Sequence, residues 1–144
     1  MTDLVVLGRV GMERVAFDAA VIEAALDLHE IVPVPLAPPH IRGIAAVRSQ
    51  VLTVVDVGLA VGQGSACEGR RVLVVQSEGH RYALLVDAVD EVVTPEAVHA
   101  GIDASLGAGW NRVATSTIEA GGQYHLLLDV PALIAGPTAC RVAA

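Results

Sequence analysis

Residues 38–57 of the chain read PPHIRGIAAVRSQVLTVVDV. Two apolar runs, 41–47 and 50–55, flank the polar pair Arg48 and Ser49, which predicts two strands joined by a tight turn. The second run is almost continuously apolar, as is typical of a strand that is buried on both faces.

A strand followed by an aspartate occurs twice in the chain. Asp56 ends the run just described and is expected to cap a short helix over 57–61. Residues 53–57 resemble residues 126–130, where Asp129 takes the place of Asp56, 73 residues further on. This spacing, about half the chain, indicates two similar β subdomains, although a strand followed by aspartate also recurs by chance.

Most of the remaining chain consists of short apolar runs separated by turn residues. These runs predict strands at 4–7, 15–17, 72–75, 82–86, 89–93, 110–118 and 124–128. Prolines predict an extended segment over 31–35, and the Gly- and Ala-rich stretch 100–109 is expected to be irregular. Together the runs indicate a mainly β protein with about ten short strands.

Residues 18–26 predict a further short helix. Asp18 is a suitable N-cap, and the alanines of residues 18–26 favour a helix. The residues Val21, Ile22, Ala25 and Leu26 would then share one buried face.

The composition excludes several classes of function. Of the 144 residues 53% are hydrophobic, so the chain can build a core and is not expected to be disordered. The net charge of -7 argues against nucleic-acid binding, which needs clustered cations. All nine basic residues are arginines, and the absence of lysine excludes Schiff-base chemistry and a phosphate loop that uses lysine.

Cysteine usage and the chain start predict a cytoplasmic protein. Cys67 and Cys140 are too few for a disulfide scaffold, and neither has a metal-type spacing. No charged and then apolar leader follows Met1, and no apolar run approaches the ~18 residues of a membrane span.

No recognisable catalytic motif is present. The five histidines lack the spacing of metal ligands and are expected at the surface. Asp87, Asp90 and Glu91 could form a paired-acid site, but a solvated strand end is the simpler interpretation. We therefore expect no catalytic residue, no metal site and no cofactor.

Arg48 is the most informative polar residue. It interrupts two apolar strands, so its stem is expected to be partly buried and its charge to need a carboxylate partner, for which Glu23 is the candidate. A structural ion pair and a direct contact with a partner protein both remain open for Arg48.

The segment 38–57 resembles the central signature of the CheW family. The matching positions, which align without a gap, are Pro38, Ile41, Gly43, Ile44, Arg48, Val51, Val54, Val55 and Asp56. Three further blocks, 21–23, 83–89 and 126–134, resemble family blocks in the same order. The resemblance implies an all-β fold with short helices, made of two SH3-like five-stranded β-barrel subdomains packed together. Residues 1–144 would form this single CheW-like domain, with the boundary between subdomains, and any exchange of strands between them, left open.

The resemblance also implies a function. CheW proteins are non-catalytic chemotaxis adaptors that couple chemoreceptors to the histidine kinase CheA. The implied partners are the regulatory domain of CheA and the cytoplasmic tip of a methyl-accepting receptor, without nucleic acid and without membrane insertion. Arg48 and Glu23 match positions that the family associates with coupling, and Ile44, Val54 and Asp56 complete the candidate partner-binding residues.

The sequence departs from the family pattern at several positions, among them Arg14 in place of a Tyr, and this leaves alternative roles open. Ala46, Ser49, Thr53 and Ala83 replace Asn, Gly, Pro and Gly of the pattern. The first alternative is a divergent or degenerate copy that binds a single partner and modulates or inhibits a non-flagellar pathway. The second is a small hydrolase that uses the cluster of Asp87, Asp90 and Glu91.

Overall fold

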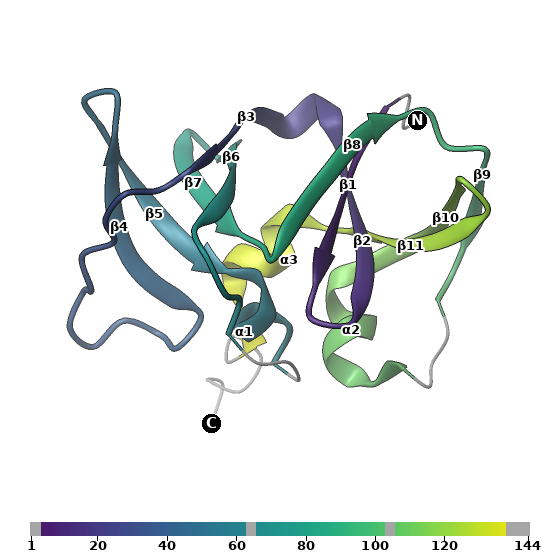
Figure 1. Ribbon diagram of the computed structural model, residues 1–144. Coiled ribbons are helices and arrows are strands. Elements are labelled where there is room, and N and C mark those ends of the chain that lie inside the picture. Colours follow the sequence, from purple (N-terminus) through teal and green to yellow (C-terminus); the bar gives the residue numbers. More distant parts are fainter. Residues whose placement is uncertain (1–3, 63–65, 103–105, 138–144) are drawn as a thin grey trace.

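The computed structural model describes residues 4–62, 66–102 and 106–137, which form two β-sheets with short helices between them (Figure 1). The six-stranded sheet, here called the first subdomain, has the order β8-β1-β2-β11-β10-β9. Its strands are β1 (Val5–Val10), β2 (Glu13–Asp18), β8 (Ala88–Val93), β9 (Ala97–Ala100), β10 (Ala114–Ala120) and β11 (Gln123–Leu128).

The five-stranded sheet, here called the second subdomain, has the order β3-β6-β7-β5-β4. Its strands are β3 (Ile22–Asp27), β4 (Ile41–Val47), β5 (Gln50–Asp56), β6 (Arg71–Ser77) and β7 (His80–Leu85). The helices are the 3₁₀ turn η1 (Ala19–Val21), α1 (Val57–Val61), α2 (Ala108–Val113) and α3 (Val130–Ala135). None of the helices in the described part of the chain is long and apolar enough to span a bilayer.

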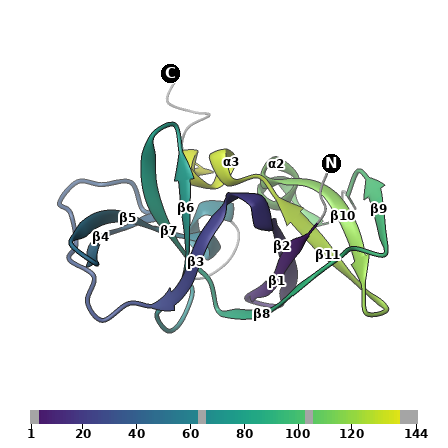
Figure 2. The ribbon, with the colours of Figure 1, turned by 90° about the horizontal axis from the view of Figure 1, so that it is seen from above.

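The chain crosses between the subdomains twice in the same way (Figure 2). After the β1–β2 hairpin it enters the second sheet as the edge strand β3, and after the β6–β7 hairpin it returns to the first sheet as the edge strand β8. One edge strand of each sheet therefore directly follows, in the chain, a hairpin that belongs to the other sheet. Separating the two subdomains would remove an edge strand from both.

The two sheets also share one pairing plan. In each, an antiparallel hairpin carries a parallel strand beside its second strand: β11 lies beside β2, and β5 beside β7. The registers place Leu126 beside Val15 and Thr53 beside Tyr82. Thr53 and Leu126 are the positions matched by the sequence repeat, so the repeat corresponds to structurally equivalent strands.

The segment 31–35 is extended only in part. Its single β-bridge joins Val32 to Ile44 of β4. The equivalent pair in the first subdomain is His99 of β9 with Thr117 of β10. Gly43 permits this approach, because a Cβ at that position would lie 2.1 Å from the carbonyl oxygen of Val32.

A continuous apolar core joins the two sheets. It contains residues of both sheets and all three α-helices, among them Phe17, Leu84, Trp110 and Leu133, which are at most 8% exposed. Burying each such side chain contributes about 1.5–3 kcal/mol relative to leaving it in water. A smaller cluster fills the first subdomain alone and consists of Val5, Leu7, Ala16, Ile118 and Ala120.

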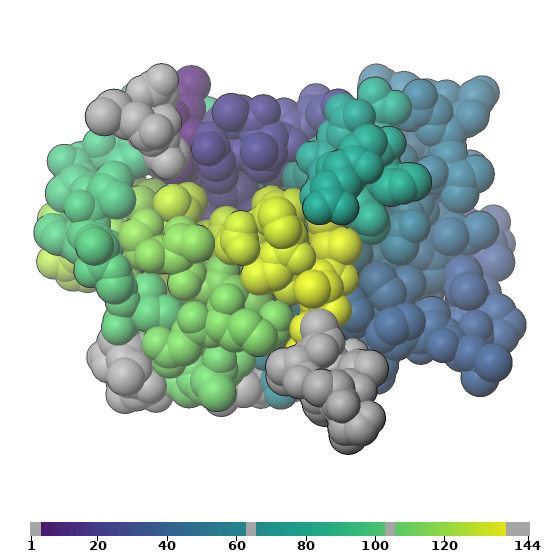
Figure 3. All heavy atoms as spheres, turned by 180° about the vertical axis from the view of Figure 1, so that it is seen from behind, coloured from purple at the N-terminus to yellow at the C-terminus, as the bar shows by residue number. Residues whose placement is uncertain are grey.

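Helix α3 lies between the two subdomains on the face opposite that of Figure 1, where Figure 3 shows it in yellow. The guanidinium of Arg112, in α2, donates to the carbonyl oxygens of Ala132 in α3 and Ala60 in α1. Arg112 thus links α2 to both α1 and α3, and the carbonyl of Ala132 also accepts from the N–H of Gly136.

The helix predicted over 18–26 is wrong. Asp18 does cap a turn, by accepting from the N–H of Ala20 at 3.0 Å, but η1 lasts only three residues before β3 begins. Residues 22–27 alternate between half-buried and exposed and pair with β6. So short a helix is marginal by itself, and the strand pairing outweighs the helical preference of alanine.

The strand predicted over 110–118 is wrong in its first half. Trp110 and Val113 lie in α2 and point into the core, and β10 starts only at Ala114. The stretch 100–109 is irregular only in part, since β9 ends at Ala100 and α2 begins at Ala108, and residues 103–105 lie outside the described residues. Apolar residues three positions apart share one face of a helix but lie on opposite faces of a strand, and a short run does not show whether one face or both are buried.

Candidate partner-binding site

Arg48 lies in the two-residue turn between β4 and β5. The φ angles are 51° at Arg48 and 68° at Ser49, so both turn residues are left-handed. This conformation matches the twist of a tight hairpin but disfavours residues other than Gly, Asn and Asp. Arg48 is exposed, which corrects the expectation of a partly buried stem: the residue sits in the turn and not within a strand.

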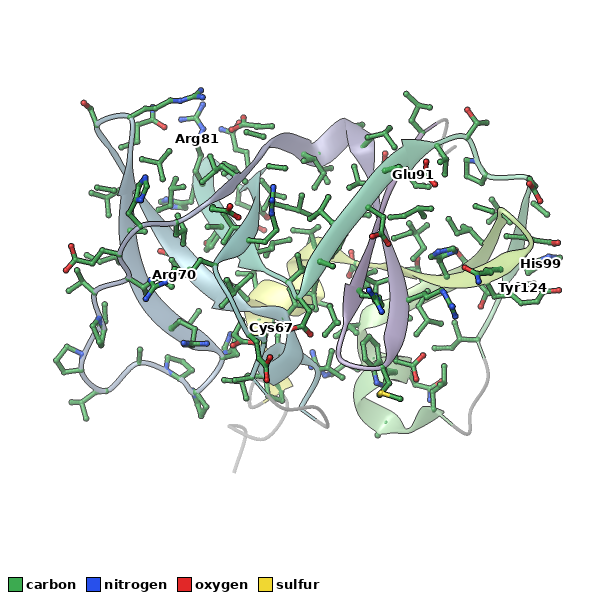
Figure 4. All side chains as sticks on the ribbon, in the orientation of Figure 1. Cys67, Arg70, Arg81, Glu91, His99 and Tyr124 are labelled. Carbon is green, nitrogen blue, oxygen red and sulfur yellow. The ribbon has the colours of Figure 1, made fainter. Side chains whose placement is uncertain are left out.

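Glu23 is paired with a different arginine from the one expected. Its Oε1 accepts from Nε of Arg81 at 2.8 Å, and Nη1 of Arg81 donates to Oε1 of Gln50 at 3.2 Å. Arg81 lies on β7 beside the β4–β5 hairpin (Figure 4). Both partners are well exposed, so the pair contributes at most about 1 kcal/mol to stability.

These residues surround one hollow in the surface. The hollow has a volume of about 290 Å³ and is here called the second-subdomain hollow. It is lined by Glu23, Ala24, Val47, Arg48, Gln50, Leu52, Val74 and Arg81. Arg48 and Glu23 thus belong to the same surface although they are not bonded to each other.

The other three candidate residues differ in their access to solvent. Ile44 is half-buried on β4, whereas Val54 and Asp56 are 0% exposed. Alternation along β5 directs Val54 into the core, and the helix cap holds Asp56 inside. Direct contact with a partner is therefore open to Ile44 but not to Val54 or Asp56 in this conformation.

Asp56 organises the junction between β5 and α1. Its carboxylate accepts from Nη1 of Arg42 at 2.8 Å and from the N–H groups of Leu59 and Cys67 at 3.1 Å. Burial, followed by the negative charge of Asp56, raises the pKa of the Cys67 thiol to about 12. Cys67 is thus an unreactive thiol in the folded protein, whereas Cys140 lies outside the described residues.

A sequence model of the CheW-like domain matches residues 4–137, almost the whole chain. The chain belongs to the CheW-like domain family. Its members are chemotaxis signalling adaptors that act as non-catalytic scaffolds, and this function agrees with the resemblance of residues 38–57.

The CheW-like fold is also found by comparison with solved structures. The crystal structure of the scaffolding protein TtCheW from Thermoanaerobacter tengcongensis matches with a TM-score of 0.78 and 19% sequence identity, over 90% of each chain. At this identity the similarity supports the two-subdomain all-β fold predicted from the sequence. A search of curated protein sequences gives no match.

The three acids of the hydrolase alternative do not converge in this CheW-like protein. Asp87 accepts from the backbone N–H groups of Gly11 and Glu68. Asp90 and Glu91 line a different hollow from that of Asp87. Asp87 therefore lies at one surface hollow, and Asp90 and Glu91 lie at another.

Two histidines expected at the surface are buried. His40 is 2% exposed, and its Nε2 lies 2.8 Å from the carbonyl oxygen of Ile134, so this nitrogen carries the proton and donates. His125, 5% exposed, lies on β11. Among residues 4–62, 66–102 and 106–137 no group of three or more His, Cys, Asp or Glu side chains is placed to hold a metal ion.

Sequence reasoning did not identify Arg81 and Gln50 as part of the site. Both are polar residues near turns, which is common at surfaces, and only the pairing of β5 with β7 brings them beside Glu23. Arg81 could have been noticed as a charge that directly precedes the apolar run 82–86. Its partner Glu23, however, lies 58 positions away in the chain.

Proposed function

We propose that this CheW-like protein is a cytoplasmic adaptor that binds the regulatory domain of CheA and the cytoplasmic tip of a chemoreceptor. The observation that carries the proposal is the exposed Arg48, presented at a hairpin tip beside the Glu23–Arg81–Gln50 network. Family membership over residues 4–137 supplies the class of partner.

The candidate residues have different roles in this proposal. Arg48 and Glu23 contact a partner directly at the second-subdomain hollow, and Ile44 adds an apolar contact on β4. Val54 and Asp56 act indirectly, by fixing β5 and the start of α1. Arg48 is exposed and forms no ion pair with any side chain of residues 4–62, 66–102 and 106–137, so it is well suited to bind a partner carboxylate in a bidentate manner.

The conformation of the turn supports a functional role for Arg48. Two left-handed residues with side chains cost free energy that a glycine would avoid. Strained backbone of this kind is often kept at binding sites, where it fixes the direction of a side chain. The turn retains its two-residue form although Ser49 replaces the Gly of the family pattern.

Isothermal titration calorimetry with the CheA regulatory domain and, separately, a receptor-tip fragment from the same genome tests the proposal. We expect saturable one-to-one binding of the kinase domain, weakened about tenfold or more by Arg48→Ala. Arg71→Ala is the matched control, because Arg71 is an exposed arginine of the same sheet that pairs with Asp27 away from the hollow. We expect this control to bind like the wild type.

Each other outcome has a defined meaning. A folded wild-type protein that binds neither partner overturns the proposal. Binding of the kinase domain without binding of the receptor fragment supports the single-partner alternative. Equal affinity of Arg48→Ala and wild type removes Arg48 from the interface.

A further inference from the structure

The first subdomain contains a hollow at the position equivalent to the second-subdomain hollow. Arg14 precedes Val15 on β2 as Arg81 precedes Tyr82 on β7, and Val15 and Tyr82 occupy equivalent places beside their parallel strands. Both arginines line their respective hollows. The hollow in the first subdomain, here called the first-subdomain hollow, has a volume of about 430 Å³.

The acids of the two hollows are also equivalent. Glu23 lies at the irregularity where β3 pairs with β6, and Asp90 lies at the matching irregularity where β8 pairs with β1. Glu23 reaches Arg81 and forms an ion pair, but Asp90, one methylene shorter, forms none with Arg14. Opposite charges thus face each other across the first-subdomain hollow without touching.

A further difference is the histidine that lines this hollow. His125 of β11 takes the place that Leu52 holds on β5, since Ile118 pairs with His125 as Ala45 pairs with Leu52. Burial, and then the charge of Arg14, lowers the pKa of His125. The ring is therefore neutral at pH 7 and offers one donor and one acceptor beside the arginine.

The walls of the hollow carry separated charges. Arg9 lies directly opposite Arg14 in the β1–β2 register, an arrangement of like charges that is unfavourable without an anion between them. Asp90 and Glu91 line the hollow from β8, and neither forms an ion pair with these arginines. Leu7 is one of the apolar side chains at its base.

The balance of charge selects the class of ligand. The lining has two arginines and three carboxylates, those of Asp90, Glu91 and Glu96, so a polyanion such as a nucleotide would be repelled. Glu96 already accepts from the N–H of Gly121, at 3.3 Å. A molecule with a carboxylate at one end and an ammonium at the other would satisfy the arginines and the β8 acids together.

We propose that the first-subdomain hollow binds a small amphoteric molecule of amino-acid size, with its carboxylate on Arg9 and Arg14 and its ammonium on Asp90 and Glu91. The ligand takes the place of the direct ion pair that Glu23 and Arg81 form in the second-subdomain hollow. This inference does not rest on the proposed adaptor function. The ligand would be a small soluble molecule, in addition to the proposed protein partners.

The test is an NMR titration of the ¹⁵N-labelled protein with glycine, β-alanine and 4-aminobutyrate, in which the two charges are increasingly far apart. Acetate and methylammonium are the controls that carry one charge each. We expect at least one amphoteric probe to shift the amide signals of β1, β8 and β11 saturably, with a Kd on the order of 1 mM or below. Each single-charge control should bind at least about tenfold more weakly.

Two variants make the assignment specific. Arg14→Gln should weaken binding of the amphoteric probe by about tenfold or more, because it removes half of the carboxylate site. Arg71→Gln, an exposed arginine of the second sheet, should leave binding unchanged. The proposal is overturned if no probe shifts these signals, if acetate alone binds as tightly as the amphoteric probes, or if Arg14→Gln binds like the wild type.

Discussion

The two subdomains share a backbone plan but differ at the aspartate that follows their parallel strand. Asp56, after β5, is fully buried and accepts from Arg42, Leu59 and Cys67. Asp129, after β11, is half-buried, and its side chain makes no capping hydrogen bond to α3. The two equivalent aspartates thus differ in role: Asp56 caps its helix with its side chain, whereas Asp129 does not.

The difference arises from the neighbouring strand. Arg42 lies at the irregularity of β4 against β5, and Thr115 holds the equivalent place on β10 and donates to the carbonyl of Leu127. Pro131 also removes an N–H donor from the first turn of α3. The two subdomains therefore share their strand pairing, whereas side chains at equivalent positions form different contacts.

The largest expected effect contrasts these aspartates. Asp56→Ala leaves the part-buried N–H of Leu59, the buried N–H of Cys67 and the guanidinium of Arg42 without this acceptor, which should lower the free energy of unfolding by about 3 kcal/mol or more. Asp129→Ala should change it by less than about 1 kcal/mol, because no cap bond is lost. Urea unfolding of both variants measures the difference, and equal losses would contradict the comparison.

The helix-ending glycines give the next contrast. A Cβ on Gly136, after α3, would lie 2.2 Å from the ring of His40, whereas one on Gly62, after α1, would meet Pro137 at 3.0 Å. Both have positive φ, so each substitution by alanine adds about 1–2 kcal/mol of backbone strain. Gly136→Ala should cost about 3 kcal/mol in total, and Gly62→Ala less, in the same urea assay.

If Gly62→Ala proves the more damaging of the two, the tight packing of His40 against the end of α3 is not structurally important. His40→Ala provides the control, because it removes the ring that the added methyl would meet. In that background Gly136→Ala should lower the free energy of unfolding only by the cost of its backbone strain.

The pair His125 and Leu52 predicts a difference in pH dependence. Because the pKa of His125 is lowered on folding, the unfolded chain binds this proton more readily. Stability linked to His125 is therefore fully present above about pH 6.5 and is lost as the pH falls through the lowered folded pKa.

His125→Leu introduces the residue type of Leu52, its counterpart in the second subdomain, and should abolish this part of the acid sensitivity. It should also raise the free energy of unfolding near neutral pH by about 1 kcal/mol, because Nδ1 of His125 is buried without a hydrogen bond. Urea unfolding at pH 7.5 and pH 5.5 measures both effects. An unchanged pH dependence would show that other groups titrate instead.

The smallest expected effect concerns the two equivalent hairpin turns. Gly121 and Gly122 form the β10–β11 turn, and Arg48 and Ser49 form the β4–β5 turn, all with positive φ. Ser49→Gly should stabilise the protein by about 0.5–1 kcal/mol, and Gly122→Ser should destabilise it by a similar amount. Thermal unfolding would detect both shifts, which should be opposite in sign.

The strand plan was largely predictable from the sequence, and the reasons are local. Alternation and turn residues mark β4, β5, β6 and β7 and the helix after Asp56 with bounds close to those observed. The helix expected at 18–26 failed because alanine carries a helical preference that the pairing of β3 with β6 outweighs.

The candidate site was predictable only in part. Arg48 and Glu23 do share a hollow, but the ion pair that Glu23 makes with Arg81 depends on the parallel pairing of β5 and β7, which no sequence period reveals. The contrast between Glu23 and Asp90 is likewise invisible until the two sheets are compared strand by strand.

The central claim, that this CheW-like protein couples a receptor to a kinase through Arg48, is tested most directly by reconstitution. The measurement is the phosphorylation rate of the CheA from the same genome on receptor-containing vesicles, with wild type, Arg48→Ala or Arg71→Ala added. We predict that wild type and Arg71→Ala change the rate alike and that Arg48→Ala loses about 90% of that change. A folded wild-type protein that leaves the rate unaltered, or an Arg48→Ala variant as effective as wild type, would contradict the claim.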